Sequence, residues 1–143
     1  MCIMKTRKLV CFVLAMLIFS ATAACAANIT FTNDLDLRMS VTLTYFDADT
    51  GAMTTQGWWH VEPGGETVVT VNADESRDIY YAAYNKEPFI DSTTRNNPQV
   101  TRWASPRTFK FATDDEPFDD GLDYWQGYFY KIDGASVRID VKR

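Results

Sequence analysis

Residues 39–45 read MSVTLTY, and this stretch decides the fold. Apolar residues occupy every odd position of the stretch, and polar residues occupy every even position. Successive side chains of a β-strand point to opposite faces, so strict alternation predicts a strand with one apolar face and one wet face. Residues 136–142, SVRIDVK, repeat the pattern near the C-terminus.

Further segments rich in β-branched and aromatic residues are typical of strands. They lie at residues 29–32, 55–61, 67–71, 79–84, 108–112 and 127–131. Turn signals separate them, among them DADTG at 47–51, EPGG at 62–65 and the pair Asp133-Gly134. No window of ten or more residues has helical periodicity. The sequence therefore predicts an all-β fold, a single antiparallel β-sandwich or partly open barrel of seven to eight short strands.

Two long stretches have no period. Residues 86–106 contain Asn96, Asn97, Pro98 and Pro106, and exceed the usual length of a loop in a compact domain. This stretch is either a functional loop or contains short structure that the pattern does not reveal. Residues 114–127 are acidic and are predicted to form a loop.

Residues 1–26 have the pattern of a secretory signal peptide. Three basic residues precede an apolar run at 9–19, and small residues follow up to residue 27. Cleavage after Ala26 would leave a single β domain, residues 27–143, in the periplasm or outside the cell. An uncleaved anchor is one alternative, because residues 9–27 carry no charge. Acylation of Cys25, which follows small residues, is another, and would make the protein an outer-membrane lipoprotein.

Charge and composition exclude several classes of function. The 143 residues include 14 basic and 19 acidic side chains, with a formal net charge of −5, whereas a nucleic-acid binder needs a basic face. A single histidine excludes metal sites built from histidine clusters. All three cysteines lie in the first 25 residues, so the mature domain would have neither thiol nor disulfide and would depend on its core. We expect no metal and no cofactor.

The pair Trp58-Trp59 is the most informative aromatic feature. Neighbouring residues of a strand face opposite ways, so both indoles cannot enter one core. Trp59 shares parity with Val61 and is predicted to point inward. Trp58 shares parity with Gln56 and His60 and is predicted to point outward, where an indole can stack on a sugar ring, bind an apolar ligand or contact another protein. The alternative is that a loop or a second layer covers it.

Other aromatic residues extend this hypothesis. Tyr80-Tyr81 has the same alternation, and Trp103 and Trp125 lie in or beside the two long loops. Loop tryptophans form carbohydrate platforms in exported domains, although they also plug the ends of sandwiches. The candidate ligand-binding residues are Trp58, His60, Tyr80, Trp103 and Trp125.

The acidic run at 114–123 raises two further possibilities. Calcium needs several carboxylate oxygens, but the spacing does not fit an EF-hand loop, which leaves a calcium site of another kind or a solvated acidic loop as the alternatives. Paired carboxylates could hydrolyse a glycosidic bond, and the candidates for that chemistry are Asp114, Glu116, Asp119 and Asp120. The sequence lacks a Gly-x-Ser-x-Gly nucleophile motif and nucleotide-binding glycine motifs.

Several short aromatic motifs together resemble one known family. They are Gly57-Trp58-Trp59, the Pro63-Gly64 turn, YYAA at 80–83 and FYKIDG at 129–134. The mature chain is similar in these motifs to domain-of-unknown-function family 1036, whose members are small exported bacterial proteins. Family members often carry cysteines around these strands and this chain does not, so the resemblance implies a divergent member. It implies bacterial export and a β domain, and it assigns no functional residue.

The sequence as a whole favours a non-enzymatic binding or interaction module in the bacterial envelope. Its expected partner is a carbohydrate or another envelope protein, with no nucleic acid and no membrane span after signal cleavage. A carboxylate-dependent hydrolase of envelope polysaccharide and a purely structural envelope component are the alternatives.

Overall fold

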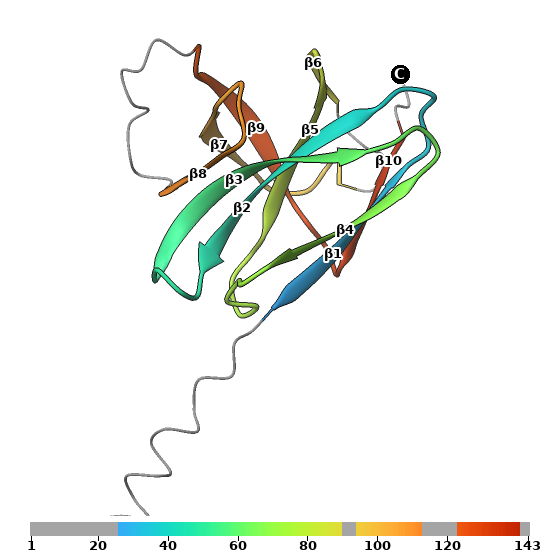
Figure 1. The fold of residues 1–143 in the computed structure, drawn as a ribbon. Coiled ribbons are helices and arrows are strands. Elements are labelled where there is room, and N and C mark those ends of the chain that lie inside the picture. Colours follow the sequence, from blue (N-terminus) through green and yellow to red (C-terminus); the bar gives the residue numbers. More distant parts are fainter. Residues whose placement is uncertain (1–25, 90–93, 113–122, 141–143) are drawn as a thin grey trace, which may run out of the picture.

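The computed structural model describes residues 26–89, 94–112 and 123–140 (Figure 1). Within these ranges the chain forms ten β-strands and no helix, which confirms the predicted all-β class. The strands are β1 (Ala27–Asn33), β2 (Met39–Asp47), β3 (Ala52–Val61), β4 (Glu66–Val71), β5 (Tyr80–Asn85), β6 (Glu87–Phe89), β7 (Gln99–Ala104), β8 (Phe109–Ala112), β9 (Trp125–Lys131) and β10 (Ser136–Ile139).

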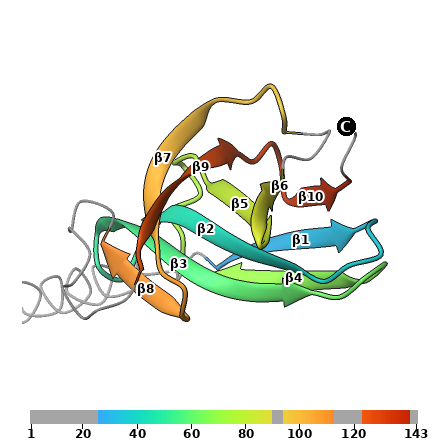
Figure 2. The ribbon, with the colours of Figure 1, turned by 90° about the horizontal axis from the view of Figure 1, so that it is seen from above.

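The larger of two sheets has the strand order β7-β9-β5-β2-β3-β8, with β6 paired to β5 off this path. All neighbouring strands in it are antiparallel. Seen from above, β7 and β9 curl over β2 and β3 to make a half-barrel (Figure 2). The predicted sandwich or partly open barrel is therefore confirmed.

The smaller sheet has three strands in the order β10-β1-β4. β1 is antiparallel to β4 but parallel to β10. The expectation of a purely antiparallel fold is wrong at this edge. The chain leaves the larger sheet after β9, turns at Gly134, which has a φ of 75°, and enters the smaller sheet beside β1 in the same direction.

All eight segments expected as strands form strands, but the structure adds two more. Both lie in the stretch 86–106 that had no period: β6 pairs with the end of β5, and β7 pairs with β9 over six residues. In β7 buried and exposed positions do not alternate strictly, because pairing with a distant strand rather than a local pattern forms it. The expected number of seven to eight strands is therefore too low.

The main core lies between the two sheets. The smaller sheet contributes alternate residues such as Ile29 and Phe31, and the larger one contributes Met39, Val41, Leu43 and Tyr45 among others. The rings of Phe31 and Tyr81 meet across the sheets with centroids 5.8 Å apart. The alternation at residues 39–45 thus places its apolar positions as predicted.

The opposite face of β2 is not wet, contrary to the sequence-based expectation. Thr42 and Thr44 are both 0% exposed, because the curled sheet covers them. Their hydroxyl groups have partners: Thr42 Oγ1 donates to the carbonyl of Gln56 at 2.8 Å, and Thr44 Oγ1 lies 2.6 Å from Thr55 Oγ1. Short polar side chains whose hydrogen bonds are satisfied within the sheet allow β2 to be buried on both faces.

A buried asparagine fixes the chain between β1 and β2. Asn33 is 0% exposed, and its Nδ2 donates to the carbonyls of Leu37 at 2.8 Å and Val61 at 3.1 Å. Its Oδ1 accepts the backbone N–H of Leu35 at 3.0 Å. These hydrogen bonds hold the connection between β1 and β2 against the end of β3, the strand that contributes Trp58 and His60 to the candidate site.

Candidate functional site

A β-bulge in β3 determines where the two neighbouring tryptophans point. Val41 pairs with Trp59 and Thr42 pairs with Gly57, so Trp58 is an extra residue without a partner in β2. The Gly57–Trp58 peptide bond is cis. Trp59 packs against the main core, as its parity predicted, and Trp58 lies on the opposite side of the sheet.

The bulge also changes which residues accompany Trp58. Gln56 was expected to share its face, but the extra residue places Gln56 on the side of Tyr45, whose hydroxyl donates to Gln56 Oε1 at 2.6 Å. That part of the prediction is wrong, since simple alternation does not hold across a bulge. His60 lies beyond the bulge and does share a cavity with Trp58.

Trp58 is held on several sides by other aromatic rings. Its indole stacks on Trp125, with centroids 5.9 Å apart and planes at 16°. Tyr84 and Phe109 meet it edge-on at 5.5 and 5.9 Å. Its Nε1 donates to the carbonyl of Ser105 at 2.8 Å. Trp58 is therefore half-buried in a fixed orientation rather than open to water as a lone surface indole would be.

A cavity of about 870 Å³ opens beside this aromatic cluster. It lies where two strands part: β9 pairs with β5 only at Tyr80 and Tyr81, and the last three residues of β5 pair with β6 instead. The lining residues are Arg38, Ser40, Trp58, His60, Ala82, Ala83, Tyr84, Asn85, Lys86, Pro106, Trp125, Gln126, Gly127, Tyr128 and Tyr130.

The apolar wall of the cavity consists of five aromatic side chains from three strands: Trp58 of β3, Tyr84 of β5, and Trp125, Tyr128 and Tyr130 of β9. Tyr128 is 61% exposed and is one of two large apolar side chains exposed in the described residues. Tyr84 is partly buried: burial raises the pKa of its hydroxyl, and a hydrogen bond with the Trp125 side chain offsets part of the rise. Burial also raises the pKa of Tyr130. These phenols stay neutral and able to donate hydrogen bonds at neutral pH.

Gly127 makes room for Tyr84. A Cβ atom built on Gly127 would lie 2.0 Å from the Tyr84 hydroxyl oxygen, so no larger residue fits while the tyrosine keeps its place. The absence of a side chain at residue 127 thus allows the Tyr84 hydroxyl to reach from β5 to β9, and both residues line the cavity.

Polar and basic groups line the other end of the cavity. His60 is exposed, and its Nδ1 lies 2.9 Å from Ser40 Oγ, a contact that orients the imidazole. Arg38 forms an ion pair with Glu62 through Nε at 3.0 Å. Lys86 is exposed at the turn between β5 and β6.

The structure brings together three of the five predicted site residues. Trp58, His60 and Trp125 line the cavity, whereas Tyr80 and Trp103 are not among its lining residues. Tyr80 lies at the start of β5, where β9 is still paired to it. Trp103 belongs to β7, one strand beyond β9.

Sequence reasoning missed Arg38, Lys86, Tyr84, Tyr128 and Tyr130. A signal existed for the tyrosines: residues 80, 82 and 84 share one face of β5, and tyrosines alternate at 128 and 130. No signal existed for Lys86, because its position depends on β6, which the sequence did not reveal.

Several sequence-based hypotheses lie outside the described residues. These are the signal peptide up to residue 25, acylation of Cys25, calcium binding by the acidic run up to residue 122, and the hydrolase candidates Asp114, Glu116, Asp119 and Asp120. In the part of the chain that the structure describes, no three His, Cys, Asp or Glu side chains are placed to hold a metal ion. No helix in that part is long and apolar enough to cross a membrane.

Comparisons with protein-family models, with curated proteins and with solved structures give no match for this chain. The resemblance to family 1036 therefore stays a prediction from the motifs, and the case for function depends on the cavity.

Proposed function

We propose that this protein is an exported, non-enzymatic binding module that holds a carbohydrate in the cavity between β5 and β9. The observation that carries the proposal is the stacked pair Trp58 and Trp125, fixed in the wall of a cavity of about 870 Å³. Export is supported by the signal-peptide pattern of residues 1–26.

The size and lining of the cavity suit a small ligand. Small-molecule sites typically enclose about 300–1,000 Å³ and combine apolar or aromatic walls with a few polar groups. Here five aromatic side chains make the wall, and polar side chains such as Ser40, Asn85 and Gln126 lie among them. A sugar matches this arrangement because its ring has apolar C–H faces, which pack on aromatic rings, and hydroxyls around its edge.

The rigidity of the wall also supports binding. Trp58 is held by one hydrogen bond and three ring contacts, and Tyr84 is held over Gly127. Aromatic side chains that are already ordered lose little conformational entropy when a ligand packs on them.

Glycan-array binding by the purified protein tests the proposal. We expect the protein to retain a defined subset of glycans, with Tyr128→Ala lowering the affinity about tenfold, which corresponds to about 1.4 kcal/mol. Tyr128 is a suitable position because it is exposed, so its truncation should not unfold the domain.

Val68→Ala is the matched control. Val68 is the other large apolar side chain exposed in the described residues, at 56%, but it lies on β4 in the smaller sheet. The control should bind as the unchanged protein does. The proposal fails if no glycan is retained, or if Tyr128→Ala and Val68→Ala have the same effect.

A further inference from the structure

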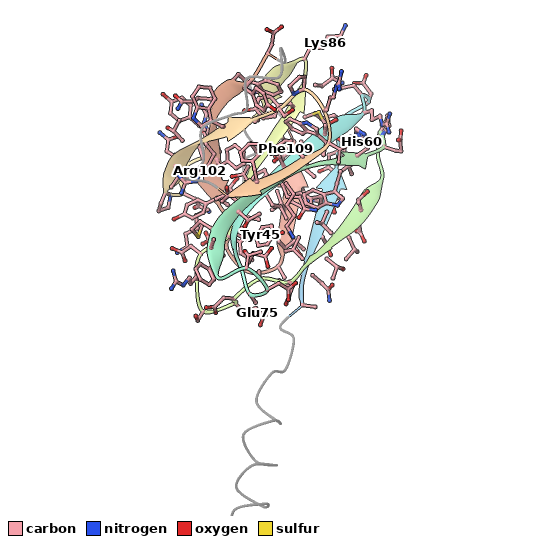
Figure 3. All side chains as sticks on the ribbon, turned by 60° about the vertical axis from the view of Figure 1, so that its left-hand side comes forward. Tyr45, His60, Glu75, Lys86, Arg102 and Phe109 are labelled. Carbon is pink, nitrogen blue, oxygen red and sulfur yellow. The ribbon has the colours of Figure 1, made fainter. Side chains whose placement is uncertain are left out.

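Within the residues that the structure describes, two charged side chains line the cavity, Arg38 and Lys86, and both are basic. Arg38 directly precedes β2, Lys86 lies in the β5–β6 turn, and His60 of β3 lines the same cavity. Figure 3 shows Lys86 and His60 in the upper part of the molecule, far from Glu75 at the opposite end. A chain with a net charge of −5 thus places two cationic side chains beside one cavity: Lys86, and Arg38, which also pairs with Glu62.

From this arrangement we infer that the ligand is an acidic sugar, whose ring packs on the aromatic wall while its carboxylate meets Arg38, His60 and Lys86. The inference depends on the proposed function and specifies the substrate class of the same site. Opposite charge at the mouth of a cavity favours encounter with such a ligand and selects against a neutral one.

The geometry of the basic groups supports a carboxylate. The Arg38 guanidinium has three nitrogens, and its ion pair with Glu62 is made through Nε. Its planar fork matches the two oxygens of a carboxylate. The contact between His60 Nδ1 and Ser40 Oγ at 2.9 Å leaves the other ring nitrogen, Nε2, out of this contact, and His60 lines the cavity.

The backbone of Lys86 gives independent support. Lys86 is the single residue between Asn85 and Glu87, which pair with each other across the β5–β6 turn. It has a φ of 62°, in the left-handed region, where glycine or asparagine is favoured over a residue with a long side chain. The turn itself does not favour a lysine at this position, and the side chain that stands there carries its charge to the lining of the cavity.

Titration calorimetry with matched sugars tests the inference. The probes are oligosaccharides of galacturonic and glucuronic acid, their methyl esters and the corresponding neutral galactose and glucose oligosaccharides. We expect at least one acidic oligosaccharide to bind about tenfold more tightly than its methyl ester, which keeps the ring and removes the charge.

Lys86→Gly separates the role of the charge from the stability of the fold. Glycine suits the left-handed turn, so this variant should be at least as stable as the unchanged protein in urea denaturation. We expect it to bind the acidic sugar at least fivefold more weakly. Arg138→Gln is the matched control, since it removes one exposed positive charge from β10 in the other sheet and should not change the affinity.

The outcomes distinguish this inference from the proposed function. Equal binding of acid and ester, or tighter binding of neutral sugars, would refute the inference and leave the carbohydrate module intact. Loss of affinity in Arg138→Gln equal to that in Lys86→Gly would show a general charge effect and refute the named site. Failure of every glycan to bind would overturn the proposed function as well.

Discussion

Changing Gly127 to alanine should distort the cavity, and changing Tyr84 to phenylalanine should repair it. A Cβ atom at residue 127 would lie 2.0 Å from the Tyr84 hydroxyl oxygen, whereas the next atom of that side chain, Cζ, would lie at an ordinary 3.4 Å. The clash therefore involves one oxygen atom. Displacing the packed Tyr84 side chain to relieve this overlap costs about 1–3 kcal/mol.

The expected magnitudes follow from these contacts. Gly127→Ala alone should lower the free energy of unfolding by about 1–3 kcal/mol. Tyr84→Phe alone removes the hydrogen bond with the Trp125 side chain and should cost about 1 kcal/mol. The double variant has no clash and should be no less stable than Tyr84→Phe, because alanine is favoured over glycine in a strand by about 0.5–1 kcal/mol.

Urea denaturation of the four proteins measures the coupling between the two positions. We expect a double-mutant-cycle interaction energy of about 1–3 kcal/mol, well above the 0.3–0.5 kcal/mol scatter of independent sites. Additivity within about 0.5 kcal/mol would refute the reasoning, because it would mean that Tyr84 does not lie over Gly127.

Two further predictions concern stability. Asn33→Ala should lower the free energy of unfolding by about 2–4 kcal/mol in urea denaturation. The reason is that buried carbonyls, among them those of Leu37 and Val61, lose their hydrogen-bond donor. A loss below about 0.5 kcal/mol would contradict this prediction. Asp47 is 1% exposed and pairs with half-exposed Lys110 at 2.9 Å; burial raises its pKa, but hydrogen bonds from Lys110 and the backbone lower it more, so the folded pKa lies below the ordinary value of 3.8. Because the pKa is depressed in the folded protein, the stability that the charged Asp47 contributes is complete well above pH 3.8 and is lost as the pH falls through the folded pKa. Asp47→Asn should therefore cost about 1–2 kcal/mol near neutral pH and show a weaker loss of stability toward low pH; parallel pH profiles of the two proteins would show that the pair does not act this way.

Much of the architecture follows from local sequence. Alternation at residues 39–45 predicted β2, and the positive φ of Gly51 and Gly64 agrees with the predicted turns at 47–51 and 62–65. The Gly65 N–H donates to the carbonyl of Glu62 at 2.9 Å, as a tight turn requires. These features depend on neighbours in the chain, so a local pattern can predict them.

The features that the sequence did not predict depend on distant pairing. β7 forms because β9 pairs with it, and β10 joins β1 in parallel across more than a hundred residues. The curl of the larger sheet covers Thr42 and Thr44, although their polarity indicated a wet face. Polar residues that satisfy one another inside a sheet cannot be told from solvent-exposed ones by alternation alone.

The candidate site was predicted in part for the same reason. Strand parity predicted the opposite placement of Trp58 and Trp59, but a bulge moved Gln56 to the other face. Trp125 was predicted as a candidate binding residue in or beside a long loop, and it forms the start of β9 beside Trp58. Whether Tyr80 or Trp103 joins these residues depends on where β9 parts from β5, which is a property of the whole sheet.

The indole N–H resonances of the four tryptophans test the central claim most directly. Titrating ¹⁵N-labelled protein with a galacturonic acid oligosaccharide or another glycan retained on the array should shift the signals of Trp58 and Trp125, which line the cavity. Trp59, which packs against the main core, and Trp103, in β7, should keep their positions. Shifts confined to Trp103, or saturable binding that leaves Trp58 and Trp125 unmoved, would contradict the account.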